Sequence, residues 1–459
     1  INIKAQVFSN GEGAQIISKS GSLKAEVTGA DIEKVKFAEV ERAYLPAYNR
    51  GSIITEKDIN ITTTNEKGSI ANFGILQAGN ENSEGSVNLK SNNNLYMIEI
   101  LGSEIGKDNS NVWAAKEINI DVKNNMLEYG SLWADGGDIN INVGKDAIIS
   151  GDLDTATLTG NRIEAKGNVK ITIGKDIINQ NVIVADEGNI DIKANGSVLN
   201  SKHGDKYVVG YKENPVLVKD VINDALKALG FNYKLEDDAT SNGVLDARNG
   251  RVYIEAGASE KDYAVVVNNS TIYAKDNIYV SSRTGDVANG GDFLVNKGDI
   301  TINAAKRIAN IGSMKVVATS AEAVSGNVNM IAGEDLVNYG VVESPEGDIL
   351  LTVTNDGIIY NAEQADFLTK GNISILNQTK DQDKLYRFDI DLPENPTLME
   401  LYEAKKVKSE TGKYLNGSVT NKGDLLANQG TIRIKSNAAD VYNYDDFDSC
   451  DRKDDPKHY

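Results

Sequence analysis

The heptapeptide Gly137-Asp138-Ile139-Asn140-Ile141-Asn142-Val143 gives the clearest indication of fold class in this 459-residue chain. Its apolar and polar residues alternate strictly, which is the pattern of a β-strand with one buried face. The same pattern recurs at residues 167–173, 188–194, 298–304, 326–330, 347–351 and 371–375. Recurrence of one short unit along a chain is the signature of a repeat architecture, so the intervening residues should contain the rest of the unit.

Two further elements complete the unit. The first is an apolar segment that runs through an asparagine to a glycine, as in Ile308-Ala309-Asn310-Ile311-Gly312 and Leu336-Val337-Asn338-Tyr339-Gly340. Asparagine and glycine are the residues that tight corners favour. The second is a short strand such as Gly130-Ser131-Leu132-Trp133-Ala134, which leads into the next alternating segment. Each unit therefore contains three strands and three corners.

The spacing of the units predicts a parallel β-helix. Unit starts lie 21 residues apart at Gly167 and Gly188 and 24 apart at Gly347 and Gly371. With about 20 residues per coil, equivalent strands stack about 4.8 Å apart, and the corner asparagines can form amide ladders. The core prediction concerns one isoleucine from each of four coils, namely Ile141, Ile171, Ile192 and Ile302. The predicted fold class is all-β, a right-handed parallel β-helix (β-solenoid) with a few helical insertions.

Composition narrows the functional classes. The formal net charge of −19 opposes binding to nucleic acid, whose phosphates would be repelled. Cys450 is the only cysteine, and His203 and His458 are the only histidines, so the sequence predicts no catalytic triad and no metal or cofactor site. We therefore expect a non-catalytic protein without cofactors.

The repeat pattern predicts a single β-helix over residues 1–437, followed by an acidic, flexible tail at 438–459. Three insertions interrupt it, at 29–50, 201–249 and 380–414. Each is expected to contain a helix: near residues 32–42, from Pro215 onward, and near 396–402. Because the chain starts at Ile1 inside a strand pattern, we expect it to be a piece of a longer protein.

Large aromatic and arginine side chains mark the candidate partner-binding residues, because such side chains dominate binding energy at interfaces. Trp113 and Trp133 precede strands in the same register one coil apart, which predicts neighbouring indoles on one face. They either pack locally or form a platform for sugar rings. The remaining candidates lie in two insertions: Tyr207, Tyr211, Phe231, Tyr233, Tyr386, Arg387, Phe388 and Tyr402. The alternative is that these aromatics pack against the β-helix.

The ordered combination of Gly-Asp-Ile-x-Ile, apolar-x-Asn-x-Gly and Gly-x-Leu-x-Ala segments resembles the haemagglutinin repeats of the filamentous haemagglutinin family. That family consists of two-partner secreted bacterial exoproteins, including adhesins and the stalks of contact-dependent inhibition effectors. The resemblance implies a right-handed β-helix, export through an outer-membrane transporter, and a location outside the bacterial cell. The sequence contains neither the family's amino-terminal secretion signatures nor a recognisable toxin domain.

The leading functional prediction is a structural and adhesive shaft segment of a large secreted surface protein and virulence factor. Its expected partners are a receptor or glycan on a host or neighbouring cell, the transporter during export, and other copies through self-association along the shaft. The first alternative is a stalk that presents a separate toxin or receptor-binding tip. The second is a β-helix enzyme that cleaves polysaccharides, which requires a groove with several convergent carboxylates or basic residues.

Overall fold

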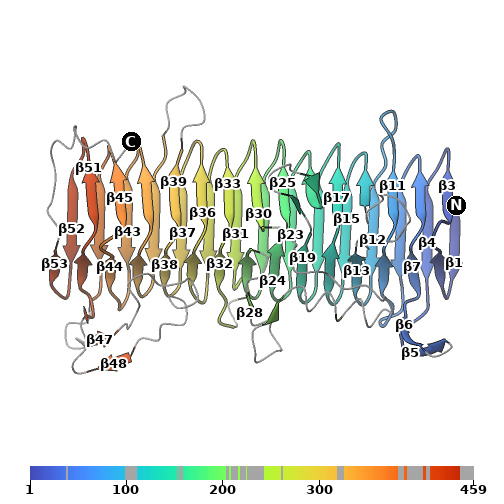
Figure 1. The fold of residues 1–459 in the computed structure, drawn as a ribbon, viewed down its shortest axis with the longest axis horizontal. Helices are drawn as coiled ribbons and strands as arrows, with labels where there is room; N and C mark the ends of the chain where they lie inside the picture. The colour runs from blue at the N-terminus through green and yellow to red at the C-terminus, as the bar shows by residue number, and fades with distance from the viewer. Residues whose placement is uncertain are drawn as a thin grey trace. The chain divides into compact units, whose positions relative to one another are not determined.

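The computed structural model describes residues 1–37, 40–98, 111–151, 153–154, 159–202, 206–207, 216–217, 224, 242–259, 262–317, 325–380, 387–389, 407–409 and 414–444. The chain divides into two compact units, Ile1–Gly250 and Arg251–Tyr459. The elements of the described residues are β-strands, and Figure 1 shows them as short arrows stacked side by side within each unit. The predicted all-β class is confirmed.

The first unit contains three parallel sheets, because each coil contributes one strand to each sheet. The first sheet orders β1 (Asn2–Ala5), β4 (Leu23–Val27), β9 (Ile59–Thr63), β12 (Val87–Ser91), β15 (Ile118–Val122), β18 (Ile139–Val143), β23 (Val169–Ile173) and β26 (Ile190–Ala194). The second orders β2 (Phe8–Asn10), β7 (Ala47–Asn49), β10 (Ile70–Asn72), β13 (Leu95–Ile98), β16 (Met126–Tyr129), β19 (Ala147–Ser150), β24 (Ile177–Gln180) and β27 (Val198–Asn200). The third orders β3 (Gln15–Ser18), β8 (Ser52–Thr55), β11 (Ile75–Ala78), β14 (Asn111–Ala114), β17 (Ser131–Ala134), β22 (Arg162–Ala165), β25 (Val182–Ala185) and β30 (Val244–Ala247).

The second unit repeats this arrangement. Its first sheet orders β31 (Val252–Ala256), β34 (Ile278–Ser282), β37 (Ile300–Ala304), β40 (Val328–Ala332), β43 (Ile349–Val353), β46 (Ile373–Asn377) and β52 (Ile432–Ser436). Its second orders β32 (Val266–Asn268), β35 (Val287–Asn289), β38 (Ile308–Asn310), β41 (Leu336–Asn338), β44 (Ile359–Asn361), β50 (Val419–Asn421) and β53 (Val441–Asn443). Its third orders β33 (Thr271–Ala274), β36 (Asp292–Val295), β39 (Ser313–Val316), β42 (Val341–Ser344), β45 (Asp366–Thr369) and β51 (Asp424–Ala427). Both units are parallel β-helices.

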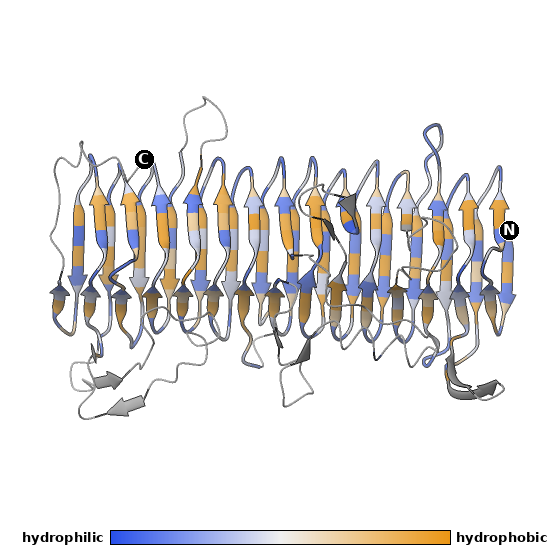
Figure 2. Ribbon diagram, in the orientation of Figure 1, coloured by the Kyte–Doolittle hydropathy of each residue, from blue (hydrophilic) through white to orange (hydrophobic). Residues whose placement is uncertain are grey.

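The core consists of equivalent apolar residues stacked from coil to coil. Ile171 pairs in register with Ile141 on one side and with Ile192 on the other. These three isoleucines are each 1% exposed, and Ile302 of the second unit is fully buried, which confirms the core prediction. Figure 2 shows the cause, because hydrophobic and hydrophilic residues alternate along the strands. One face of each strand therefore points inward and the other faces outward.

A buried asparagine ladder runs along the second sheet of the second unit. Each Nδ2 donates to the Oδ1 of the asparagine in the next coil over 2.8–2.9 Å. The rungs are Asn268, Asn289, Asn310, Asn338, Asn361, Asn421 and Asn443. The predicted ladder is therefore present.

The glycine that follows the ladder asparagine has a steric role. A Cβ atom on Gly340 would lie 1.9 Å from the carbonyl oxygen of Gly312 in the previous coil. Any larger residue would push the stacked corners apart, so close approach of the backbones explains the glycine in this motif.

The insertion near residue 30 differs from its prediction. Residues 32–42 were expected to form a helix, but β5 (Ile32–Phe37) and β6 (Val40–Tyr44) form an antiparallel hairpin. The Val35-Lys36-Phe37 segment alternates apolar and polar residues, and β-branched and aromatic residues favour strands. The helix prediction was therefore wrong, and the coil already resumes at Ala47 in β7.

The other insertions also contain strands. β28 (Lys206–Tyr207) pairs antiparallel with β29 (Val216–Leu217), so the predicted helix does not begin at Pro215. Asp224 is helical, and the rest of that predicted helix lies outside the described residues. The coil resumes at Val244 in β30, before the predicted boundary at 249. The short β-hairpin can form here because a strand pair satisfies its own backbone hydrogen bonds.

Near the end of the chain the boundaries differ in a similar way. β47 (Arg387–Asp389) pairs antiparallel with β48 (Val407–Ser409) and with β49 (Tyr414–Leu415), whereas the helix predicted near 396–402 lies outside the described residues. The β-helix continues through β53, so the predicted tail at 438 begins too early. Asn443 explains the difference, because it supplies the last rung of the asparagine ladder. A further hairpin, β20 (Leu153–Asp154) with β21 (Thr159–Gly160), was not predicted.

Candidate functional site

The outer face of the third sheet in the first unit contains the predicted tryptophan pair. Trp113 of β14 and Trp133 of β17 lie directly opposite each other in register, and both are half-buried. The Nε1 of Trp113 donates a hydrogen bond of 2.8 Å to the Oδ2 of Asp135. The predicted coil alignment of the two tryptophans is confirmed, and their partial exposure is compatible with contact to a ligand.

An arginine covers one indole of this pair. The guanidinium carbon of Arg162 lies 4.7 Å from the centre of the Trp133 ring, within the range of a cation–π interaction. The Nε of Arg162 also lies 2.6 Å from the Oε2 of Glu164 on the same strand. Because two different partners hold the guanidinium, the Trp133 ring and the Glu164 carboxylate are fixed relative to each other.

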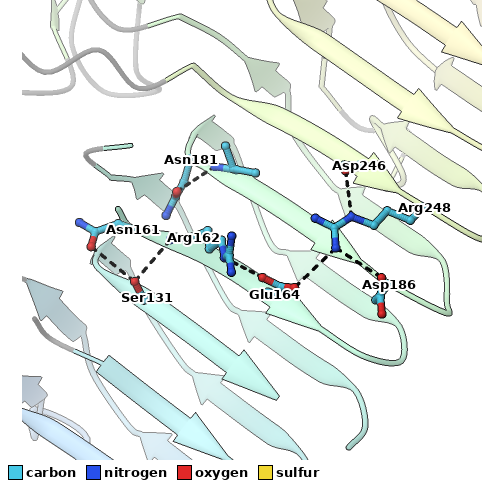
Figure 3. A network of polar contacts seen from close by, with 9 residues as sticks. Ser131, Asn161, Arg162, Glu164, Asn181, Asp186, Asp246 and Arg248 are labelled. Carbon is cyan, nitrogen blue, oxygen red and sulfur yellow. Dashed lines mark hydrogen bonds and ion pairs between the residues drawn. The ribbon is translucent and has the colours of Figure 1, made fainter. Parts of the chain in front are cut away.

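Glu164 extends the site across the neighbouring coils. Its Oε1 lies 3.7 Å from the Nη1 of Arg248, which is also 3.4 Å from the Oδ1 of Asp186. The Nε of Arg248 pairs with the Oδ2 of Asp246 at 3.3 Å. Figure 3 shows this continuous polar network over strands β22, β25 and β30. We call Trp113, Trp133, Asp135 and this network the third-sheet surface.

A buried corner supports the third-sheet surface from beneath. Asn181 is fully buried, and its Oδ1 accepts a hydrogen bond of 2.8 Å from the backbone N–H of Val182. Its Nδ2 donates to the backbone oxygens of Gly130 and Ser150 and to the Oε2 of Glu128, over 3.2–3.4 Å. One buried asparagine thus connects several coils through hydrogen bonds at the corner that precedes β25.

Negative charge predominates on the third-sheet surface. Its carboxylates outnumber its guanidinium groups, since Glu164, Asp186 and Asp246 pair with Arg162 or Arg248 and Asp135 accepts a hydrogen bond from Trp113. Burial raises the pKa of the Asp246 carboxyl above its ordinary value, whereas the charge and hydrogen bond of Arg248 oppose that rise. Neutral or cationic ligands therefore fit this surface better than anions do.

Removing the central cation should make stability depend on pH. In an Arg248→Met variant the Asp246 carboxyl loses the cation and the hydrogen bond that oppose the rise of its pKa, so that pKa should rise further in the folded state. The folded protein would then bind more protons than the unfolded chain, and its stability would fall as pH increases. We expect the deficit in melting temperature against the natural protein to be largest at pH 7 and to shrink toward pH 4. Lys166→Met, which breaks an exposed pair with Glu187, is the matched control and should show no such trend.

Sequence reasoning missed the arginines and carboxylates of the third-sheet surface. Arg162 lies on β22 and Arg248 directly follows β30, far along the chain, and only the coil register brings both close to Glu164. The sequence did contain one signal, because Glu164 and Asp246 each occupy an outward-facing position of the repeat. Glu164 aligns with Val184, and Val184 aligns with Asp246. To align Asp246 from the sequence, one must know at which residue the insertion before β30 ends, and the repeat pattern alone does not define that residue.

Three of the other predicted partner-binding residues lie in short strands of the insertions. Tyr207 lies in β28, and Arg387 and Phe388 lie in β47. The remaining five lie outside the described residues: Tyr211, Phe231, Tyr233, Tyr386 and Tyr402. Their role in binding stays a prediction.

No family model matches the chain, and no curated protein or solved structure matches it either. In the part of the chain that the structure describes, no group of three or more histidine, cysteine, aspartate or glutamate residues is arranged to hold a metal ion. A helix of the length and hydrophobicity that crossing a membrane requires is likewise absent from the described residues. The β-helix and the third-sheet surface are therefore the features from which a function can be inferred.

Proposed function

We propose that this chain is a structural and adhesive segment of a secreted bacterial surface protein, and that its third-sheet surface binds glycans. The resemblance of its repeats to filamentous haemagglutinins supports export through an outer-membrane transporter and a location on the cell surface. The stacked core of each unit supports the structural role, because stability in such repeats comes mainly from neighbouring coils.

The single observation that carries the adhesive role is the tryptophan pair beside a fixed ion pair. Indole rings stack on the apolar faces of sugars, and neighbouring polar groups can bind the hydroxyls. Trp113 and Trp133 share one face, and Arg162 and Glu164 are held next to them. The excess of carboxylates around these rings favours neutral glycans over acidic ones.

The test replaces the tryptophans. We expect a Trp113→Ala, Trp133→Ala variant to lose at least about tenfold in affinity for a neutral glycan, since each aromatic contact contributes about 1 kcal/mol. Binding would be measured by interferometry on immobilised neutral oligomers of β-linked hexose and N-acetylhexosamine. Leu294→Ala, an outward position on the third sheet of the second unit, is the control and should bind normally. Equal binding by the tryptophan variant and the natural protein would refute the proposal.

A second candidate function, glycan cleavage, follows from the convergence of Glu164, Asp186 and Asp246. Glycosidases use paired carboxyl groups as acid and as base or nucleophile. Here all three carboxylates face the same Arg248 guanidinium at 3.3–3.7 Å, which favours an ion-pair network that fixes the coils. We expect that incubation with the neutral oligomers releases no reducing ends. If the natural protein released reducing ends and the Glu164→Gln variant did not, that result would support glycan cleavage instead.

A further inference from the structure

The corner of the second unit that carries the asparagine ladder also carries a cluster of tyrosines. Tyr360 precedes ladder residue Asn361, and Tyr442 and Tyr444 flank ladder residue Asn443. Because the ladder bonds Asn361, Asn421 and Asn443 at 2.8 Å per step, the residues beside them are fixed coil by coil. Tyr339, which follows Asn338, lies with its ring centre 5.8 Å from that of Tyr360.

A lysine lies between two of these rings. The Nζ of Lys422 is 5.9 Å from the ring centre of Tyr360 and 5.8 Å from that of Tyr444. Tyr444 is 68% exposed and Tyr442 36% exposed, and the rings of these two residues stack with centres 6.4 Å apart. We call Tyr339, Tyr360, Lys422, Tyr442 and Tyr444 the tyrosine corner.

The ion pairs of the described residues distinguish Lys422 from other lysines of its unit. Lys306, Lys315 and Lys370 of the same unit each pair with a glutamate, whereas Lys422 makes no ion pair within the described residues. The nearby carboxylate of Asp440 accepts a hydrogen bond of 3.1 Å from the hydroxyl of Tyr442. Tyrosine rings attract a cation without cancelling its charge, so the ammonium group keeps its capacity to bind an anion.

We infer that the tyrosine corner binds a carboxylated sugar. The apolar face of a pyranose ring can stack on an exposed tyrosine while its carboxylate pairs with Lys422. Tyr360 aligns with Tyr442 through Thr420, two coils or roughly 9.6 Å away, so the two rings can contact different sugars of one glycan chain. In a protein with a net charge of −19, a cation that lies near two aromatic rings and makes no ion pair within the described residues offers a local site for an anion.

The experiment measures binding of the full chain to immobilised 3′-sialyllactose and to an oligogalacturonate. Lactose and the methyl-esterified oligogalacturonate, which lack the charge, are the matched ligands. We expect binding to at least one acidic sugar and at least tenfold weaker binding to its neutral counterpart. Binding to 3′-sialyllactose would identify a sialic acid as the source of the carboxylate, and binding to the oligogalacturonate would identify a uronic acid. Absence of binding to both acidic sugars would overturn the inference.

Variants assign the binding to the tyrosine corner. Lys422→Met keeps most of the side-chain volume and should weaken binding about tenfold, the effect of losing one charge-assisted hydrogen bond. Lys422→Arg should retain most of the affinity, and Lys315→Met, which breaks a pair with Glu343, should bind normally. Undiminished binding by Lys422→Met would refute the site. The tryptophan variant of the third-sheet surface should bind acidic sugars normally, so the failure of one proposal does not affect the other.

Discussion

An Ile171→Asp substitution is expected to lower the stability of the first unit by several kcal/mol, because it places an unpaired charge in an apolar stack. Ile171 is 1% exposed and lies between Ile141 and Ile192 in successive coils. A carboxylate at this position has no water and no cation to replace its hydration. The neighbouring coils should loosen as well, because each coil is stabilised mainly by its neighbours.

Two controls separate this effect from a general loss of packing. Thr172→Asp introduces the same charge at the next residue, which is exposed, and should change the melting temperature very little. Ile171→Val removes one methylene and should cost about 1 kcal/mol. Thermal unfolding followed by circular dichroism, with hydrogen exchange to locate the loosened coils, tests the prediction. An unchanged melting temperature for Ile171→Asp would contradict the register.

The second large effect is expected in the asparagine ladder. An Asn338→Leu substitution should destabilise the second unit by about 3–6 kcal/mol, because each buried polar group left without a partner costs about 1–3 kcal/mol. Asn338 accepts from the Nδ2 of Asn310 at 2.8 Å and donates to the Oδ1 of Asn361 at 2.9 Å. It also bonds the backbone oxygen and nitrogen of Gly340, at 3.0 and 3.3 Å. Leucine fills a similar volume and replaces none of these bonds.

The matched control for the ladder is Asn119→Leu. Asn119 belongs to a ladder on the outer face of the first sheet, where it bonds Asn88 at 2.9 Å and Asn140 at 3.0 Å. It is half-buried, so water can replace the lost partners, and the cost should stay below about 1 kcal/mol. Chemical denaturation of the two variants compares them directly. A similar cost for both would show that burial does not determine the strength of the ladder.

Sequence reasoning predicted the repetitive part of this fold because the same physical demand recurs in each coil. The alternation around Ile141 and the Asn-x-Gly corner at Asn338 both indicate which side chains point inward. Inward positions can be predicted because they follow the local periodicity of the sequence. The hairpin at Ile32–Phe37 was missed because a short mixed segment of charged and apolar residues satisfies both a helical and a strand pattern. Local sequence could not decide between them.

The candidate sites depended on information that local patterns do not contain. Trp113 and Trp133 were placed correctly because an uninterrupted coil separates them. The contact of Glu164 with Arg248 depends on where the chain re-enters the stack after a long insertion. The tyrosine corner was missed for a related reason, since Tyr360 and Lys422 come together only because β44 pairs with β50 across another insertion.

The strand pairing across the insertions has an evolutionary consequence. Val182 pairs with Val244 and Ile359 with Val419, in the same register that uninterrupted coils use. The entropy of closing a loop grows only slowly with its length, so added residues at a corner scarcely affect the pairing of the strands around them. New sequence can therefore be acquired, exchanged or lost at the corners while the coils stay unchanged, so the insertions can vary in evolution independently of the β-helix.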